Sequence, residues 1–464
     1  MVSGLKTSRN EMKSSPRAKN LQQGLAPKNW VALVLAALAM TGMGGIFALP
    51  AQAQETRQNI IGIQKMDLSR MVVVGDSLSA GFQNDSLWDA QQPNGWASLL
   101  ANQAQVLLVL PLIASPGIPN HLELISATFP PIVRPVPGPG PSFPFRDPPI
   151  QQATDLAVPD AVLQDVLTTQ PSVPIDDFTD LILGVPGLFA APPVSLSQVQ
   201  WAQALQPTTI FVWIGNNDIL GAATAANPSG ATSLTSFNSS YVQMMNELAA
   251  THVPVVVANI ADPTAAPFFT PASTIAEETG LPLFVLGPIL GIGPGDYVLP
   301  AGIALIPDIL SNPSLGPLPS SDVLRFFQVL EVRALIDAYN LIIAVQAFEH
   351  GAVLVDVHSL VNRLRSQGVE ANGKHLTTAF LGGLFSLDGV HPTNTGYAII
   401  ANEFIATLNQ TRRTSIPLVD IDAVACGDPL VFATAALSTS LAQHVSAEAA
   451  EGLRSALFHN KPRL

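Results

Sequence analysis

The chain has 464 residues, of which 48% are apolar and only 12% are charged, so it can bury a large core and is not a disordered polymer. Its formal net charge of −13 makes nucleic acids and anionic membrane surfaces poor partners, because both require a basic footprint. The single cysteine, Cys426, excludes an internal disulfide and a structural zinc site built on cysteines.

The first 53 residues have the pattern of an export signal. Six basic residues precede an apolar run from Trp30 to Leu49, and Ala51-Gln52-Ala53 has the small residues of a cleavage site. We therefore expect export to the periplasm or the extracellular space after cleavage near Ala53. Because the apolar run is about 20 residues long, an uncleaved membrane anchor through residues 30–49 is the alternative. Cleavage removes six basic residues and one acidic residue, so the mature chain is more acidic than the whole.

Five apolar runs of strand length predict buried strands, and segments with helical apolar spacing lie between them. The expected strands cover residues 70–74, 105–110, 208–214, 255–260 and 352–357. The expected helices cover residues 95–103, 160–168, 234–251 and 321–350, and a last one ends near residue 408. This alternation predicts an α/β fold, with a doubly wound parallel sheet that has helices on both faces.

Two long apolar stretches rich in proline and glycine interrupt the pattern, at about residues 119–207 and 262–319. The prolines between residues 130 and 141 are too dense for a helix or a central strand, so the first stretch is expected to run over the surface. Long loops of this kind in compact folds usually serve as lids or binding walls. Residues 411–464 are expected to be an extension made of a loop and an alanine-rich helix, residues 432–458.

Several polar side chains lie in turns after predicted strands or near the end of the domain. Together they have the groups needed for nucleophilic catalysis by a serine. Ser77 is a candidate nucleophile, and His391 can take its proton. Asp388, three residues before the histidine, can hold the imidazole in the right tautomer. The Asn217 side chain and the backbone N–H groups of Ser77 and Gly117 can donate to a developing oxyanion. Turns after parallel strands meet at one edge of the sheet, where ligands bind.

Each of these features also has a plainer explanation. Ser77 and its neighbour Asp76 can simply cap a helix. The pair Asp388 and His391 can form a turn with local hydrogen bonds, and Asn217 can merely tolerate a left-handed backbone.

The sequence predicts no metal and no cofactor. The remaining histidines lack the spacing of metal ligands, and no paired zinc motif is present. Asp356 and His358, at the end of the fifth expected strand, are interpreted as structural.

Four blocks of the chain resemble, in the same order, those of the SGNH (GDSL) hydrolase family: Gly75-Asp76-Ser77-Leu78, a lone Gly117, Gly215-Asn216-Asn217-Asp218 and Asp388-x-x-His391-Pro392. The resemblance spans residues 71–408. It implies a flavodoxin-like α/β/α sandwich with a five-stranded parallel sheet. It also implies Ser77 as nucleophile, His391 as base, Asp388 as its orienting acid, and an oxyanion hole made by Ser77, Gly117 and Asn217.

The resemblance predicts a hydrolase domain over residues 54–410, which cleaves carboxylic esters through an acyl-serine intermediate. The apolar inserts are expected to form an acyl-binding groove, which favours lipid-like esters over sugar acetates. The plainer alternative is that the inserts only support the domain. A protein of this fold that binds a lipid or a protein partner without turnover is the alternative from another functional class.

Overall fold

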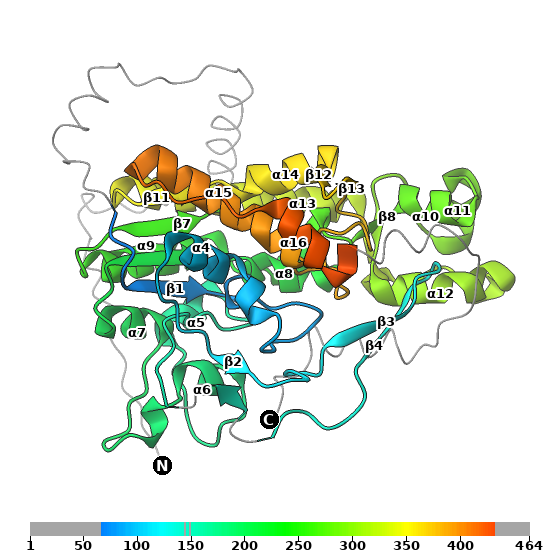
Figure 1. Cartoon of the computed structure of the whole chain (residues 1–464). Helices are drawn as coiled ribbons and strands as arrows, with labels where there is room; N and C mark the ends of the chain where they lie inside the picture. Colours follow the sequence, from blue (N-terminus) through cyan, green and yellow to red (C-terminus); the bar gives the residue numbers. More distant parts are fainter. Residues whose placement is uncertain (1–65, 143–144, 148–149, 432–464) are drawn as a thin grey trace, which may run out of the picture. The chain divides into compact units, whose positions relative to one another are not determined.

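The computed structural model describes residues 66–142, 145–147 and 150–431 (Figure 1). The export signal at residues 1–53, its alternative as an anchor at residues 30–49, and the helix expected at residues 432–458 all lie outside the described residues. Among the described helices, none has the length and apolar character needed to cross a membrane.

Four parallel strands form the central sheet. In spatial order they are β1 (Met71–Gly75), β6 (Thr209–Trp213), β7 (Val255–Ala258) and β11 (Val353–Val355). Every residue of β1, β6 and β7 is buried, as expected for parallel strands covered on both faces. The α/β fold with a parallel central sheet predicted from the sequence is therefore confirmed.

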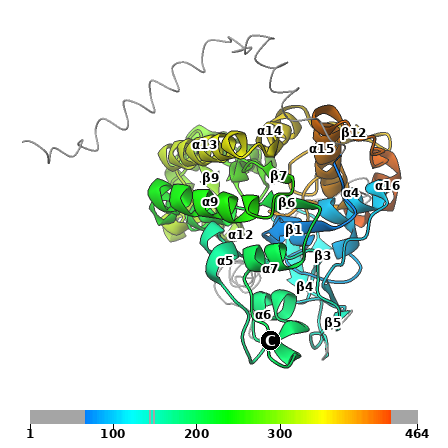
Figure 2. The ribbon, with the colours of Figure 1, turned by 90° about the vertical axis from the view of Figure 1, so that its left-hand side faces the viewer.

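Alternate residues of each strand pack into two separate apolar cores, because successive side chains of a strand point to opposite faces. Val72 and Val74 lie in the first core, and Met71 and Val73 lie in the second. Figure 2 shows the sheet between the helices of these two layers. The helices that supply the first core are α5 (Leu163–Thr168), α6 (Phe178–Leu183), α7 (Gln198–Ala204), α8 (Asn217–Thr224), α9 (Leu234–Ala249) and α13 (Phe326–Glu349).

The second core is supplied by helices that come mainly from the carboxyl-terminal part of the described chain. They are α4 (Trp96–Ala104), α14 (Val357–Gln367), α15 (Asn394–Arg412) and α16 (Ile421–Gly427). The ring of Trp96 stacks on that of Phe404 with 3.9 Å between centroids, which joins α4 to α15. A small hairpin of β12 (Val369–Ala371) and β13 (Lys374–Leu376) follows α14.

The strand predicted at residues 105–110 is wrong. The segment that lies beside β1 is residues 154–158, which runs parallel to it: Val73 N–H donates to Thr154 O at 2.9 Å, and Val158 N–H donates to Gly75 O at 3.1 Å. Residues 106–110 form no strand, and Leu107 is 71% exposed. A segment of the first insert therefore lies beside β1, where the second of the five expected strands was predicted. It forms an isolated β-bridge with β1 and not a full strand.

The first insert is more regular than its proline content predicts. It contains the antiparallel pair β3 (Leu122–Ser126) and β4 (Ile132–Pro135), and β2 (Leu112–Ile113) pairs with β5 (Arg146–Asp147) just before and within it. The short helix expected at residues 160–168 is present as α5. Because α5, α6 and α7 pack on the first core, this insert is partly a component of the main domain.

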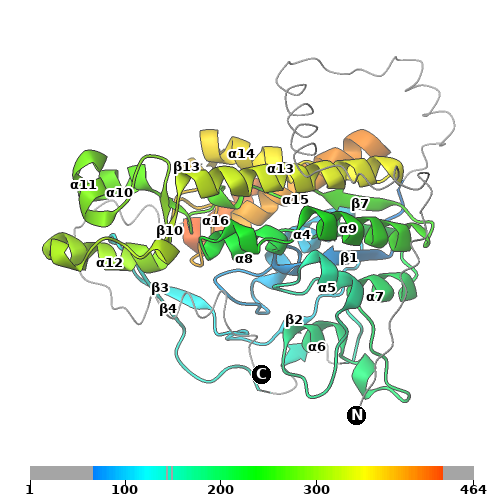
Figure 3. The ribbon, with the colours of Figure 1, turned by 180° about the vertical axis from the view of Figure 1, so that it is seen from behind.

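The second insert has its own apolar cluster, which includes Ile275, Leu286 and Ile306. We call residues 270–324 the helical insert. Figures 1 and 3 show its helices beyond one end of the central sheet. Its elements are β8 (Thr270–Pro271), α10 (Ala272–Thr279), α11 (Leu283–Leu290), β9 (Tyr297–Val298), α12 (Pro300–Ser311) and β10 (Val323–Leu324), with the three strands in one antiparallel sheet.

The buried carboxyl of Asp155, in the edge segment, predicts a pH-dependent stability. Burial raises the pKa of Asp155 to about 8, and this effect is larger than the lowering caused by the hydrogen bond that its carboxylate accepts from Ala157 N–H. The unfolded chain loses this proton near its ordinary pKa, so this group makes folding less favourable as pH rises from about 4 to 8. Asp155→Asn removes that ionisation, and its unfolding free energy should therefore improve relative to wild type between pH 5 and pH 8 in urea denaturation.

The exposed Asp89 provides the matched control. Asp89→Asn should leave the pH dependence of unfolding as it is in wild type. A difference between Asp155→Asn and wild type that stays constant across this pH range would contradict the role given to Asp155.

Candidate active site

Ser77 is held at the carboxyl end of β1 by a sharp turn into the one-turn helix α3 (Ser77–Ala80). The Asp76 carboxylate caps this helix by accepting from Leu78 N–H at 3.1 Å. A Cβ at Gly75 would lie 2.5 Å from Ser79 Oγ, so only glycine allows the turn to pack this closely. The capping alternative therefore applies to Asp76, while the Ser77 hydroxyl is left to face another element.

That element is the turn before α15, which brings His391 to the serine. His391 Nε2 lies 2.8 Å from Ser77 Oγ, although the two residues are 314 positions apart. On the other side of the ring, His391 Nδ1 lies 3.1 Å from Asp388 Oδ2. The ring also packs on Phe82, with 4.8 Å between centroids. The three side chains thus have the order of hydroxyl, imidazole and carboxylate needed for proton transfer from the serine.

The Asp388 carboxylate is fully buried but well bonded. It accepts from the backbone N–H groups of Asp85, Val390 and His391, each at 2.8 Å. Burial alone would raise the pKa of Asp388, but the charge and hydrogen bonds of His391, with the Val390 N–H, outweigh it and lower the pKa. Asp388 is therefore anionic at neutral pH and can stabilise a charged imidazole.

Two neighbouring carboxyl groups respond in the opposite direction. Burial raises the pKa of Asp76 to about 6, although Asn216 Nδ2 donates to it at 2.9 Å. Burial, together with the nearby Asp388 charge, raises the pKa of Asp85 well above its usual value. Of these three buried carboxyl groups, Asp388 is therefore the one whose pKa the surroundings lower.

Asn217 lies at the first residue of α8 and lines the same cavity as Ser77 and His391. One of its amide hydrogens is used, since Asn217 Nδ2 donates to Ala161 O at 3.0 Å. A side-chain amide has two N–H donors, so one remains for a ligand. The left-handed backbone alternative does not apply, because Asn217 is helical.

Gly117 is not brought to this site. Its N–H already donates to Ala114 O at 3.0 Å, and the next residue, Ile118, pairs with Leu87. The error follows from the misplaced second strand, because the turn after residues 105–110 does not lie at the edge of the sheet beside β1.

The turn that does follow the edge segment contains Asp160, which the sequence analysis missed. Asp160 has a left-handed backbone with φ of 64°, a conformation that favours glycine. Its N–H makes no hydrogen bond within the described part of the chain. The turn is tied to the α8 turn on both sides, through Asn217 to Ala161 O and through Leu163 N–H to Asp218 Oδ2 at 2.8 Å. The signal available was the short apolar run Leu156-Ala157-Val158 before Pro159, within a proline-rich insert.

The family of the chain follows from its sequence match. A model of the family described as GDSL-like lipase/acylhydrolase matches residues 71–404, which covers the central sheet, both inserts and the three site residues above. The chain belongs to this family. The resemblance to SGNH (GDSL) hydrolases is thus confirmed, and the chain is a carboxylic ester hydrolase of the GDSL type.

Solved structures related to this GDSL hydrolase are distant. LAE5, an alpha/beta hydrolase enzyme from the metagenome of Lake Arreo in Spain, is 14% identical over 73% of this chain and 94% of its own, with a TM-score of 0.33. Axe2, an acetylxylan esterase from Geobacillus stearothermophilus, is 11% identical over 74% of this chain and 96% of its own, with a TM-score of 0.34. None of the curated proteins compared matches this chain significantly. At these values the likeness carries no argument about substrate.

Two neighbouring cavities of this GDSL hydrolase share lining residues, and Ser77 lines the smaller one. The smaller, about 90 Å³, is lined by Ser77 and His391 and by apolar side chains. The larger, about 460 Å³, is lined by Asp388 and Gly389 and by residues of both inserts. Ala266 and Thr378 line both cavities. The apolar residues of the larger cavity include Phe129, Pro130, Phe268, Phe269 and Ile303.

The pair Asp356 and His358 is bound by local structure. Asp356 caps α14 through Ser359 N–H at 3.0 Å, and His358 Nδ1 lies 3.0 Å from Ile260 O.

Among the described residues, one acidic group has the geometry to hold a cation, Asp176 with Asp177 and Asp180. Its Asp180 carboxylate accepts from the backbone of Ser172 and Asp176, so local folding accounts for it.

Proposed function

We propose that this chain is an exported serine esterase that uses Ser77 to cleave carboxylic esters through an acyl-enzyme. The observation that carries the proposal is the 2.8 Å contact between Ser77 Oγ and His391 Nε2, with Asp388 behind the imidazole. A serine hydroxyl is a weak nucleophile until a neighbouring base removes its proton. This geometry supplies such a base and fixes its orientation.

The reaction proceeds in two halves. Ser77 Oγ attacks the ester carbonyl carbon while its proton passes to His391 Nε2, and the tetrahedral oxyanion forms. The oxyanion then collapses, and His391 returns the proton to the leaving alcohol, which leaves an acyl-serine. A water molecule, deprotonated by His391, attacks this acyl group and releases the carboxylic acid and free Ser77. Asp388 stays ionised and stabilises the imidazolium in both halves.

The oxyanion is stabilised by donors from three turns. We assign the backbone N–H of Ser77, the free amide hydrogen of Asn217 and, in place of Gly117, the backbone N–H of Asp160. Neither backbone N–H has a hydrogen-bond partner within the described residues. Donors that are already oriented before the reaction stabilise charge without reorganisation, and the loss of one typically costs about 10²–10³-fold in kcat.

The substrate class that fits best is a lipid-like ester. The smaller cavity exposes mostly apolar groups beside Ser77, and the larger cavity continues from it between the two inserts. Burying an alkyl chain there is favourable by about 0.8 kcal/mol per methylene group. This favours the acyl-groove interpretation of the inserts over the purely structural one, although α5 to α7 of the first insert also support the core.

A GDSL-fold protein that binds without turnover is the second candidate. The paired cavities would serve a binder equally well, but a binder has no need for the contacts between Ser77, His391 and Asp388. Export is supported only by the amino-terminal sequence pattern. Amino-terminal sequencing of the exported protein should therefore begin at Gln54, and a start at the initiating methionine would count against cleavage.

Replacement of Ser77 tests the catalytic assignment. Ser77→Ala should abolish turnover of p-nitrophenyl butyrate and covalent labelling by a fluorophosphonate probe, because both require the hydroxyl. Circular dichroism should show an unchanged fold. Asn217→Ala should keep the probe reaction but lower kcat by about 10²–10³-fold, through loss of an oxyanion donor.

Ser79, two residues further along the same turn, is the control for this series. It is buried like Ser77 but its hydroxyl has no hydrogen-bond partner within the described residues. Ser79→Ala should therefore keep wild-type rates and labelling. Wild-type turnover by Ser77→Ala, or a wild-type enzyme that the probe fails to label, would reject Ser77 as nucleophile.

Chain-length preference tests the acyl groove. For p-nitrophenyl esters from acetate to palmitate, kcat/KM should rise with chain length, because longer chains bury more apolar surface in the cavities. Ala304→Trp, which fills part of the larger cavity, should lower kcat/KM for long esters far more than for acetate. Ser311→Trp, on the exposed end of α12, is the control and should leave the profile unchanged. A sharp preference for acetate would contradict the groove.

A further inference from the structure

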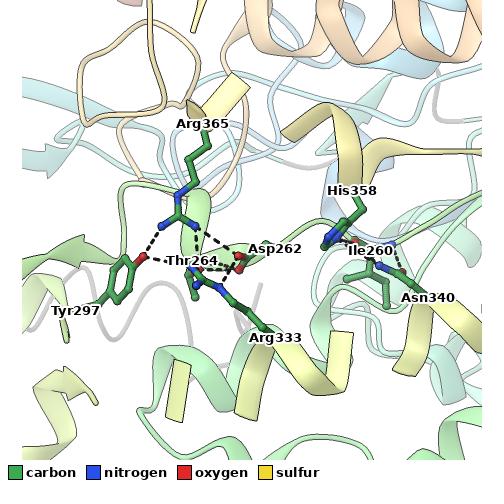
Figure 4. A network of polar contacts seen from close by, with 8 residues as sticks. All are labelled: Ile260, Asp262, Thr264, Tyr297, Arg333, Asn340, His358 and Arg365. Atoms are coloured by element: carbon green, nitrogen blue, oxygen red, sulfur yellow. Dashed lines mark hydrogen bonds and ion pairs between the residues drawn. The ribbon is translucent and has the colours of Figure 1, made fainter. Parts of the chain in front are cut away.

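A network of charged side chains lies at the junction of the two cavities, and it contains one more positive than negative charge (Figure 4). Asp262 Oδ2 is 2.9 Å from Arg333 Nε and 3.5 Å from Arg365 NH1. The other oxygen, Asp262 Oδ1, already accepts from the N–H and hydroxyl of Thr264, at 2.9 and 2.7 Å. One carboxylate therefore serves two guanidinium groups.

Tyr297 of the helical insert contacts both guanidinium groups. The Tyr297 hydroxyl, from β9, accepts from the NH2 groups of both Arg333 and Arg365 (Figure 4). Arg365 comes from α14, so its guanidinium is held between the main domain and the insert. A cation fixed in this way binds an anion with less loss of side-chain entropy than a freely rotating one.

The position of Arg365 relates the network to the reaction site. Arg365 and Thr264 line the larger cavity, while Asp262 lines the smaller one together with Ser77. The larger cavity has two other charged lining residues, Glu278 and Asp388. Among the described residues that line this cavity, Arg365 is the one with a positive charge, while Asp388 is engaged by His391 and Glu278 is acidic.

Arg365 retains donors that the protein does not use. The contacts of its NH1 with Asp262 and Thr264 are long, both at 3.5 Å. Its Nε has no hydrogen bond within the described residues, and its side chain is 32% exposed.

We propose that Arg365 is a specificity-determining residue, which binds an anionic oxygen group of the ester substrate in the larger cavity. The guanidinium matches a carboxylate or a phosphate equally well, since both present two oxygens to its planar donors. The preferred substrate is then an amphiphile with an apolar chain, a scissile ester and an anionic group. This inference rests on the proposed ester hydrolysis and names the class of ester.

The apolar walls of the larger cavity restrict where an anionic group of the substrate can lie. An anion without a partner is costly to place among apolar walls such as those of Phe268 and Ile303, and the guanidinium offsets that cost at one point only. A neutral ester of the same size gains the apolar contacts but no charge-assisted hydrogen bond. The enzyme should therefore discriminate by charge at equal chain length.

Two matched substrate pairs test the proposal and distinguish the side of the ester that carries the anion. The first pair is the mono-p-nitrophenyl ester of octanedioic acid against p-nitrophenyl octanoate, with the anion on the acyl side. The second is 1-octanoylglycerol 3-phosphate against 1-octanoylglycerol, with the anion on the alcohol side. In one pair, wild-type kcat/KM should favour the anionic member by about ten-fold, the size of one charge-assisted hydrogen bond, and added salt should reduce the ratio.

Arg365→Met should bring this ratio close to one, and Arg365→Lys should restore part of it. Arg363→Met is the control: Arg363 lies on the same helix and pairs with Glu403 away from both cavities. It should leave the ratio unchanged. The proposal is overturned if the wild-type enzyme shows no charge preference in either pair. It is also overturned if Arg365→Met lowers kcat/KM equally for both substrates of a pair. A wild-type enzyme that cleaves no ester overturns the proposed function itself.

Discussion

The hydrogen bond between Ser77 and His391 is the interaction that the catalytic proposal depends on, and the fold positions its two partners. It joins the turn after the first strand to the turn before α15, and it forms only because the sheet brings both turns to one edge. Fully buried strands with a separate core on each face keep that edge rigid. Precise placement matters because proton transfer requires the hydroxyl and the imidazole within hydrogen-bond distance.

The buried carboxyl groups of the domain differ in the direction of their pKa shifts. Asp388 has three backbone donors and the imidazole, so it remains charged despite complete burial. Asp155, with one backbone donor, and Asp85 have raised pKa values. The charge of His391, together with the hydrogen bonds to the carboxylate, outweighs burial at Asp388 alone among these groups.

The inserts contribute the walls of the larger cavity, which lies beside the catalytic edge. Residues of both inserts form the larger cavity. The hydroxyl of Tyr297, in the helical insert, accepts from Arg333 of α13 and from Arg365 of α14, and this ties the insert to the two helices. We propose the apolar walls and the fixed guanidinium as two distinct sources of selectivity, one for chain length and one for charge. Both depend on loops that the sheet itself does not require.

Local pattern was enough to predict β1, β6, β7 and β11, the family blocks, and the residues Ser77, Asn217, Asp388 and His391, because buried strands and polar turns leave compact signals in the chain. It failed where a choice between distant segments was needed. Residues 105–110 and the segment 154–158, which contains Leu156, Ala157 and Val158, both contain apolar residues, and only pairing with β1 decides between them. This is why we propose Asp160, and not Gly117, as the third oxyanion donor. The charge on the cavity wall, likewise, arises from residues more than 100 positions apart, Asp262 and Arg365, whose meeting is a property of the packed structure alone.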